Sequence, residues 1–509
     1  MTHNTRPAKP SFLTLDHIWI IVALTMFILR PLLTPIPPND FWWHMATGRL
    51  IIFEGGIPAL DSFSFTQAGV SFYNQSWLSQ VLMYGLYQLG NIPLVLLVQA
   101  SVITGAYGLL LWLCIKRTQQ LRLSVVIMLI ATLPLSFDNW VVRPQSYVLP
   151  FFVVFLTILT AYRLGWSNRL WVLPLVMVLW VNMHGSFVLG LALMGIIFVG
   201  EALKALGRTI RRPSADDPPE SSANSTTPVL SRQYLLWGSI TALTILINPQ
   251  GFGVLGYVRD LLESSSVTSL VTEWASPTIR DTNGLIFFVF LIGCGAILTY
   301  ARRHPDLTDV LLFAAFLWLA LGASRNIVWF GFVATPLIAV QAATFFSSTK
   351  PARQTRGSPF LNRIIVGLLV FLIFLASPWI KPAIFPPSVG ALLSEGTPTQ
   401  AVTALHNLED PPQRLFHEMG YGSYLIWEAP DQPVFIDPRI ELYPFDQWVD
   451  YINLGQANNV AQILQTYAID GLLLSKEQQS SLVDLAQDDP AWQNVYEDEF
   501  SILFTKQSP

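Results

Sequence analysis

Apolar runs of about 20 residues recur along most of this 509-residue chain, and they limit its fold more than any other feature. A helix needs about 20 apolar residues to cross the ~30 Å hydrocarbon core of a bilayer. Charged residues make up 12% of the chain, which is about half of the roughly 25% typical of soluble domains. The sequence therefore predicts an α-helical polytopic membrane protein.

The apolar runs predict about eleven transmembrane helices. We place them at residues 17–36, 92–115, 123–141, 146–162, 170–183, 186–203, 233–249, 283–300, 308–323, 326–346 and 364–380. The apolar stretch at 77–89 has only 13 residues, which is too short for a full crossing. We therefore expect an interfacial or re-entrant helix there.

The distribution of basic residues orients these helices. With residues 1–16 in the cytoplasm, the predicted inner segments hold 18 Lys and Arg residues, and the outer loops hold 5. Because cytoplasmic loops carry the excess of Lys and Arg, this bias predicts a cytoplasmic N-terminus and an extracytoplasmic C-terminus. The transmembrane domain then covers 17–380, with a first outer loop at 37–91. A Pro/Ser/Thr-rich composition predicts a disordered cytoplasmic loop at 205–232.

The composition changes in the C-terminal region, residues 381–509. This region has 5 Lys and Arg residues against 18 Asp and Glu residues. Short β-like runs (SYLIW, PVFID, GLLLS and SILFT) alternate with polar stretches of helical character. The pattern predicts a small soluble α/β domain on the outer face.

Polar residues collect at the predicted outer ends of the helices. They are Asp40, His44, Arg49, Asp61, Arg143, Gln145, Asn182, His184, Asn248, Glu273, Arg325 and Asn326. Ionisable groups at membrane depth are costly and usually face a cavity or a partner. This set is therefore expected to line one outward-facing cavity. For Gln145, Asn182 and Asn248 a structural role competes, because polar residues also cap helices in turns.

Two arginines at the outer helix ends favour a bound anion. Arg143 and Arg325 stand directly beside apolar spans. The guanidinium group is always charged and its planar fork fits a phosphate. The alternative is that Asp40 and Glu273 pair with these arginines in salt bridges.

The histidines and carboxylates leave catalysis and metal binding open. His44 and His184 either transfer protons or serve structural roles. No spacing of His and Cys indicates a zinc site. A divalent cation such as Mg²⁺ or Mn²⁺ held by carboxylates is compatible with the sequence. The net charge of −4 gives no indication of a nucleic-acid partner.

Aromatic residues of the first outer loop have two interpretations. Trp42, Trp43, Tyr73 and Trp77 fit an interfacial aromatic belt, which anchors membrane proteins at the level of the lipid headgroups. The same rings could also stack on sugar rings.

Motifs along nearly the whole chain carry a family resemblance. They are DFWWHMATGRLI, ALDSFSFTQAG, WLSQ, VRPQSY, LWVNMHGSFVLG, LINPQGFG, TEWASP, SRNIVWF and VFIDPRIELYP. The chain resembles the GT-C class of membrane glycosyltransferases, and more closely a group of bacterial membrane proteins allied to it. The resemblance implies transfer of a sugar from a polyprenyl-phosphate donor to an envelope acceptor, at the outer face of the bacterial plasma membrane.

The resemblance also implies roles for individual residues. Asp40 matches the acid that directly follows the first span and acts as general base or metal ligand, with Asp61 and His44 as further catalytic residues. Arg143, Arg325 and His184 would hold the donor phosphate. The substrate cavity would include Arg49, Gln145, Asn182, Asn248, Glu273 and Asn326. The chain has Asn39-Asp40 where better-known members have paired acids, which leaves metal dependence open.

Two other functions compete with glycosyl transfer. A non-catalytic scaffold for envelope assembly would act through the acidic C-terminal domain, where Asp437 and Arg439 either bind an acceptor or form a salt bridge. A lipid or solute transporter is the third possibility, although no inverted repeat is visible.

Overall fold

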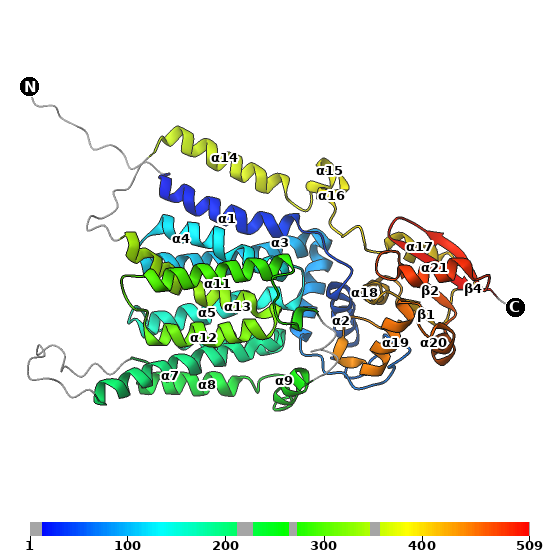
Figure 1. Cartoon of the computed structure of the whole chain (residues 1–509), viewed down its shortest axis with the longest axis horizontal. Coiled ribbons are helices and arrows are strands. Elements are labelled where there is room, and N and C mark those ends of the chain that lie inside the picture. The colour runs from blue at the N-terminus through cyan, green and yellow to red at the C-terminus, as the bar shows by residue number, and fades with distance from the viewer. Residues whose placement is uncertain (1–12, 211–227, 264–271, 347–356, 508–509) are drawn as a thin grey trace, which may run out of the picture.

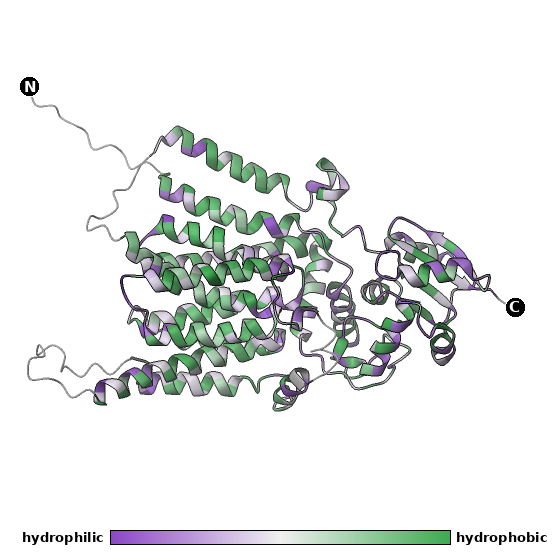
Figure 2. Cartoon of the chain, viewed as in Figure 1, coloured by the Kyte–Doolittle hydropathy of each residue, from purple (hydrophilic) through white to green (hydrophobic). Residues whose placement is uncertain are grey.

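The computed structural model describes residues 13–210, 228–263, 272–346 and 357–507. Long helices lie side by side in one bundle, and a smaller part with a four-stranded sheet is attached at one end of it (Figure 1). Apolar residues dominate the bundle, and polar residues concentrate at its ends and in the smaller part (Figure 2). We call the end that carries the sheet the domain end.

The bundle contains a helical segment at each predicted span. These segments are α1 (Leu15–Leu33), α3 (Trp77–Thr118), α4 (Leu121–Ile127), α5 (Pro144–Arg163), α6 (Val172–Met183), α7 (Val188–Ile210), α8 (Arg232–Thr244), α11 (Thr282–Tyr300), α12 (Leu307–Gly322), α13 (Ile327–Ala343) and α14 (Pro359–Leu375). Among the described residues, six helical segments are long and apolar enough to cross a membrane, and four more are apolar but shorter. The protein is therefore a membrane protein, while the count of eleven spans stays a prediction.

Helix α3 consists of two helices joined at a break. Gly90 and Asn91 have non-helical backbone angles, and Asn91 is left-handed with φ 58°. Asn tolerates this conformation better than most residues, and Pro93 then starts the next helical turn without a backbone donor. The stretch 77–89 is thus a separate helical segment ahead of the long one.

The C-terminal part is a small α/β unit, as predicted. Its sheet has the order β1-β2-β4-β3, with β1 parallel to β2 and the other pairs antiparallel. The strands are β1 (Leu415–His417), β2 (Gly471–Ser475), β3 (Trp492–Glu497) and β4 (Ser501–Lys506). The helices are α15 (Lys381–Ile384), α16 (Pro387–Gly390), α17 (Thr399–His406), α18 (Met419–Glu428), α19 (Phe445–Gly455), α20 (Val460–Tyr467) and α21 (Ser480–Asp488). Strand β2 is buried along its whole length, so it forms the centre of the core.

Two of the four predicted strands are wrong. GLLLS and SILFT are β2 and β4, but SYLIW lies in α18, and PVFID forms only isolated bridges through Val434. A short apolar run does not distinguish a buried strand from a buried helix. Glu418 favours the helix as its N-cap residue, because its carboxylate accepts a hydrogen bond from the Tyr421 N–H at 3.0 Å in the first turn.

The predicted disordered loop at 205–232 falls largely outside the described residues, which omit 211–227. The prediction is wrong for the first six residues of this loop, because they are helical and α7 continues to Ile210. The last turns of α7 lie at the bundle end opposite the domain end. They are amphipathic, so the helix continues through polar residues beyond the apolar run.

Helix α2 (Asp40–Glu54) lies between the bundle and the C-terminal part (Figure 1). On the bundle side it packs closely on α3, since a Cβ added at Gly48 would lie 2.2 Å from the Gln80 carbonyl oxygen. On the other side the Trp42 ring packs edge-on against Tyr424 of α18, with ring centroids 5.0 Å apart. Both neighbours therefore fix the position of α2.

Candidate functional site

Four charged side chains from four separate elements meet at the domain end. Asp40 begins α2, Arg143 precedes α5, Glu273 lies in a 3-10 turn (Thr272–Trp274), and Arg325 lies in the 3-10 turn between α12 and α13. The Arg143 Nη1 atom is 2.7 Å from Glu273 Oε1 and 3.9 Å from Asp40 Oδ2. Arg325 interacts electrostatically with the other three. We call these four residues the charge cluster.

Local sequence places Arg143 at the mouth of its helix. Pro144 follows it, and a residue before proline is driven out of the helical region. Arg143 accordingly has an extended backbone with φ −157° and ψ 163°, and the proline occupies the first helical turn, where its missing N–H costs nothing. The arginine side chain is therefore presented at the helix start, where it reaches Glu273.

Arg325 is oriented by an amide relay and an aromatic ring. Its Nη2 atom donates to Gln145 Oε1 at 3.2 Å, and Gln145 Nε2 donates to Asn139 Oδ1 at 2.8 Å. The guanidinium carbon lies 4.8 Å from the ring centroid of Trp274, a cation–π distance. Gln145, predicted as a cavity residue, is thus a buried support for the arginine.

The two carboxyl groups of the charge cluster differ in basicity. Asp40 and Glu273 keep 36% and 37% of their side-chain surface exposed. Burial raises the pKa of Asp40 above its usual value, and Arg143 opposes this only in part. Burial would also raise the pKa of Glu273, but Arg143 and Arg325 outweigh it and lower that pKa. Asp40 is therefore the stronger base, and Glu273 is the permanent counter-ion.

Two neutral histidines border the charge cluster. His44 lies one turn after Asp40 on α2, and Gln80 Nε2 is 3.0 Å from its Nδ1 atom. The Nδ1 atom of His184 accepts a hydrogen bond from the Ser186 N–H at 3.0 Å. Burial first, and then nearby positive charges, lower the pKa of both rings, that of His184 to about 3. Neither ring carries a positive charge near neutral pH, so any contact of His184 with phosphate depends on a ring N–H.

The C-terminal part contributes an acid that the sequence analysis missed. Glu441 lies in the 3-10 turn Ile440–Leu442, and its charge interacts with those of Arg439, Asp437 and Asp40. It stands in the motif VFIDPRIELYP, two residues after Arg439, so the second acid of that motif was the available signal.

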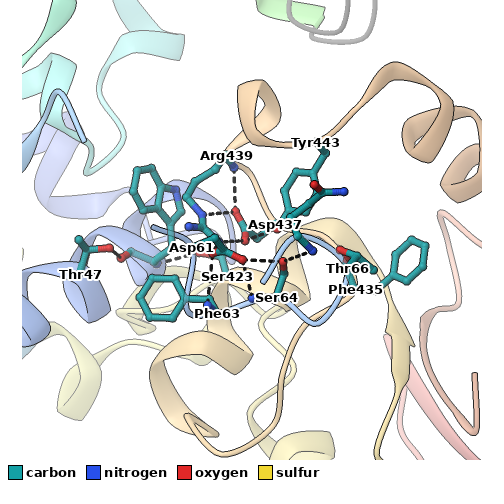
Figure 3. A network of polar contacts seen from close by, with 12 residues as sticks. Thr47, Asp61, Phe63, Ser64, Thr66, Ser423, Phe435, Asp437, Arg439 and Tyr443 are labelled. Atoms are coloured by element: carbon teal, nitrogen blue, oxygen red, sulfur yellow. Dashed lines mark hydrogen bonds and ion pairs between the residues drawn. The ribbon is translucent and has the colours of Figure 1, made fainter. Parts of the chain in front are cut away.

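Asp61 belongs to a buried ion-pair network that connects the first loop to the C-terminal part (Figure 3). The Nη2 atom of Arg439 is 2.7 Å from Asp61 Oδ1 and 2.6 Å from Asp437 Oδ2. The other Asp61 oxygen accepts hydrogen bonds from the N–H and hydroxyl of Ser64 at 3.1 and 2.6 Å. Both oxygens of Asp61 are occupied, so the structure gives it a structural role instead of the predicted catalytic one. The salt bridge considered for Asp437 and Arg439 is present.

The remaining predicted cavity residues do not join the charge cluster. Arg49 donates to the Trp427 carbonyl at 3.2 Å and lies 4.6 Å over that ring, so it holds α18. Asn326 donates to the Leu319 carbonyl at 3.3 Å in a helix-end turn. Asn182 and Asn248 line a cavity of about 190 Å³ that no residue of the charge cluster lines. A single cavity for all twelve residues is therefore wrong, because helix packing separates the turns.

Metal binding has no geometric support in the described part of the chain. There, no three His, Cys, Asp or Glu side chains are arranged to hold a metal ion. In the charge cluster the Arg143 guanidinium contacts both Asp40 and Glu273 and supplies positive charge between them. A Mg²⁺ or Mn²⁺ site stays an untested prediction.

No protein-family model and no curated protein matches the sequence. Solved structures are similar to it. The oligosaccharyltransferase of Archaeoglobus fulgidus, tethered to an acceptor peptide, matches with a TM-score of 0.54 and 11% identity over 97% of this chain and 74% of that one. ArnT from Cupriavidus metallidurans, bound to undecaprenyl phosphate, matches with a TM-score of 0.50 and 12% identity over 96% and 97%. At these identities the similarity shows the fold alone, and it confirms the predicted GT-C-like fold.

Proposed function

We propose that this protein is a membrane glycosyltransferase that transfers a sugar from a polyprenyl-phosphate donor to an envelope acceptor. The charge cluster carries the proposal, because it sets one carboxylate of raised pKa beside two arginines in a GT-C-like fold. The similar structures agree in kind: one holds undecaprenyl phosphate and the other an acceptor peptide.

Asp40 is the proposed general base. An acceptor hydroxyl gives its proton to the Asp40 carboxylate as its oxygen attacks the anomeric carbon of the donor sugar. A base works best when its pKa lies near the working pH, and burial moves the pKa of Asp40 in that direction. About a third of the Asp40 side chain is exposed, which suits contact with an acceptor.

Arg143 and Arg325 are the proposed phosphate ligands. When the sugar–oxygen bond breaks, the leaving polyprenyl phosphate gains negative charge. Fixed positive groups at the position where charge develops are commonly a large catalytic contribution. In the structure the Glu273 carboxylate forms an ion pair with Arg143 at 2.7 Å. The donor phosphate therefore has to share this arginine with Glu273 or displace the carboxylate.

The site is proposed to face outward. The excess of Lys and Arg in the predicted inner loops supports a cytoplasmic location for the opposite end of the bundle. The charge cluster and the C-terminal domain then lie on the extracytoplasmic side, where envelope acceptors are found.

The test separates phosphate binding from base chemistry. Undecaprenyl phosphate is added to the full chain in nanodiscs, and bound lipid is measured by native mass spectrometry. Transfer is measured with a lipid extract of the host's membranes as donor and its envelope fraction as acceptor. Arg325→Ala is expected to lose lipid binding and transfer, whereas Asp40→Asn is expected to keep binding and lose transfer.

Arg280→Ala is the matched control, because Arg280 is an exposed arginine at the domain end. It is expected to behave as the unmodified protein in both assays. Transfer that survives in Asp40→Asn removes Asp40 as the base. A host phenotype that needs the C-terminal domain but tolerates Asp40→Asn would favour the non-catalytic scaffold.

A further inference from the structure

A cavity lies at the domain end, and none of the four residues of the charge cluster lines it. It has a volume of about 190 Å³. This is less than the ~300–1,000 Å³ of sites for drug-sized ligands. The cavity therefore suits one compact group, about the size of a single ring.

The lining of this cavity is uncharged and rich in amides. Among the described residues that line it, none is acidic or basic, and the side chains include Tyr73, Asn74, Gln75, Trp77, Asn182 and Asn248. An amide both donates and accepts hydrogen bonds, as a sugar hydroxyl does. The Trp77 and Tyr73 rings add flat apolar surface, which suits the apolar face of a pyranose. We call this cavity the amide pocket.

One residue that lines the amide pocket has a buried acceptor without a partner among the described residues. Asn74 is 7% exposed, and its Nδ2 atom donates to Gln80 Oε1 at 2.7 Å. Its Oδ1 atom accepts no hydrogen bond from any described residue. A buried acceptor without a partner costs free energy, and nearly all such atoms in proteins are satisfied.

The pocket is preformed and connected to the charge cluster. The adjoining hairpin of the first loop is closed by a hydrogen bond from the Phe72 N–H to the Ala59 carbonyl, at 2.9 Å. Asn74 is joined through Gln80 to His44, which lies one turn after Asp40. The second connection is through Tyr73.

Tyr73 stacks on Tyr257 of α9 (Gly253–Glu263), with ring centroids 4.6 Å apart. The Tyr257 hydroxyl in turn interacts electrostatically with Arg325 and Glu441. The amide pocket thus adjoins the proposed site for sugar transfer through two chains of contacts.

We propose that the amide pocket binds an uncharged pyranose ring, either of the sugar being transferred or of the acceptor. The role of this pocket in glycosyl transfer rests on the proposed function. The type of ligand is inferred separately, from the size and the lining of the pocket.

Direct binding tests it without any assay of transfer. Methyl glycosides of glucose, galactose, mannose and N-acetylglucosamine are titrated into the full chain in nanodiscs, with ligand-observed NMR as the readout. At least one is expected to bind. Asn74→Ala, which removes one amide from the lining, is expected to raise the Kd about two- to tenfold. Ala59→Phe, which fills the pocket at a lining position, is expected to abolish binding.

Asn407→Ala is the matched control, because Asn407 is exposed at the end of α17 and is not in the lining. The proposal is overturned if no glycoside binds. It is also overturned if both pocket variants bind the glycoside as tightly as the unmodified protein does. Since the readout is binding, an inactive enzyme does not produce that outcome.

Competition identifies the source of the ring. A lipid extract of the host's membranes is compared with the same extract after mild acid hydrolysis and washing, which removes sugars linked through polyprenyl phosphate. Displacement of the glycoside by the intact extract alone assigns the pocket to the donor sugar. Displacement by neither extract assigns it to the acceptor sugar.

Discussion

The hydroxyl of Ser423, in the C-terminal domain, accepts a hydrogen bond from the backbone N–H of Trp43 at 3.0 Å. The same hydroxyl donates to the carbonyl of Asn39. The first turn of an α-helix normally joins two such groups directly, since they are four residues apart. A side chain from residue 423 thus completes the start of α2, where Asp40 lies, and the C-terminal domain helps to position the proposed base.

Ser423→Ala is expected to reduce transfer and to lower the free energy of unfolding by about 1–3 kcal/mol, because the buried N–H of Trp43 and the part-buried carbonyl of Asn39 lose their partner. Transfer is measured with saturating donor, and stability by thermal unfolding in detergent. Ser394→Ala, at a half-buried serine of the same domain, is the control. If kcat is unchanged in Ser423→Ala, the hydroxyl has no positioning role.

Asp40→Asn is expected to abolish transfer without lowering the melting temperature at pH 7–8. The folded pKa of Asp40 is raised, so its stabilising effect is present below the unfolded pKa of 3.8 and is lost as pH rises through the folded value. Near neutral pH the ionised carboxylate costs stability, and Asn removes that cost. The variant's advantage should therefore shrink as pH falls toward 4.

The same shift predicts the acid limb of the pH–rate profile. Transfer should decline as pH falls through a pKa above 3.8, because the base must be unprotonated. A marked fall in the melting temperature of Asp40→Asn at pH 7–8 would contradict the raised pKa.

Glu273→Gln is expected to tighten undecaprenyl phosphate binding. Glu273 is ionised, and it occupies Arg143 at 2.7 Å, so the amide removes both a competitor and a repelling charge. Competition between unlabelled and labelled lipid in nanodiscs measures the change, which should be severalfold and should shrink with salt. Glu428→Gln, at an exposed acid on α18, is the control. Weaker binding would show that Glu273 mainly orients Arg143.

Arg439→Met is expected to lower the free energy of unfolding by about 3–5 kcal/mol, because it leaves the buried carboxylates of Asp61 and Asp437 without their cation. Arg414→Met is the control, because Arg414 is an exposed arginine of the same domain. Denaturation followed by tryptophan fluorescence measures the loss. Equal stability of the two variants would mean that the network does not hold the domain to the first loop.

The sequence by itself determined the features that local chemistry dictates. Apolar runs specified the helices, and Lys and Arg placement predicted their orientation, because lipid selects for both along the chain. Pro144 alone explains why Arg143 stands at the mouth of α5. The distinctive motifs indicated a GT-C-like fold, and the residues at helix ends included all four members of the charge cluster.

Only the tertiary structure decided which of those residues meet. Asp61 and Arg49 carry the same signals as Asp40 and Arg143, yet the first two bind the C-terminal domain and the last two contact each other. Glu441 interacts electrostatically with Asp40 from a position 401 residues later in the chain. Hydropathy gives the depth of a residue along the bundle axis, but neighbours across the bundle depend on helix packing, which no local pattern encodes.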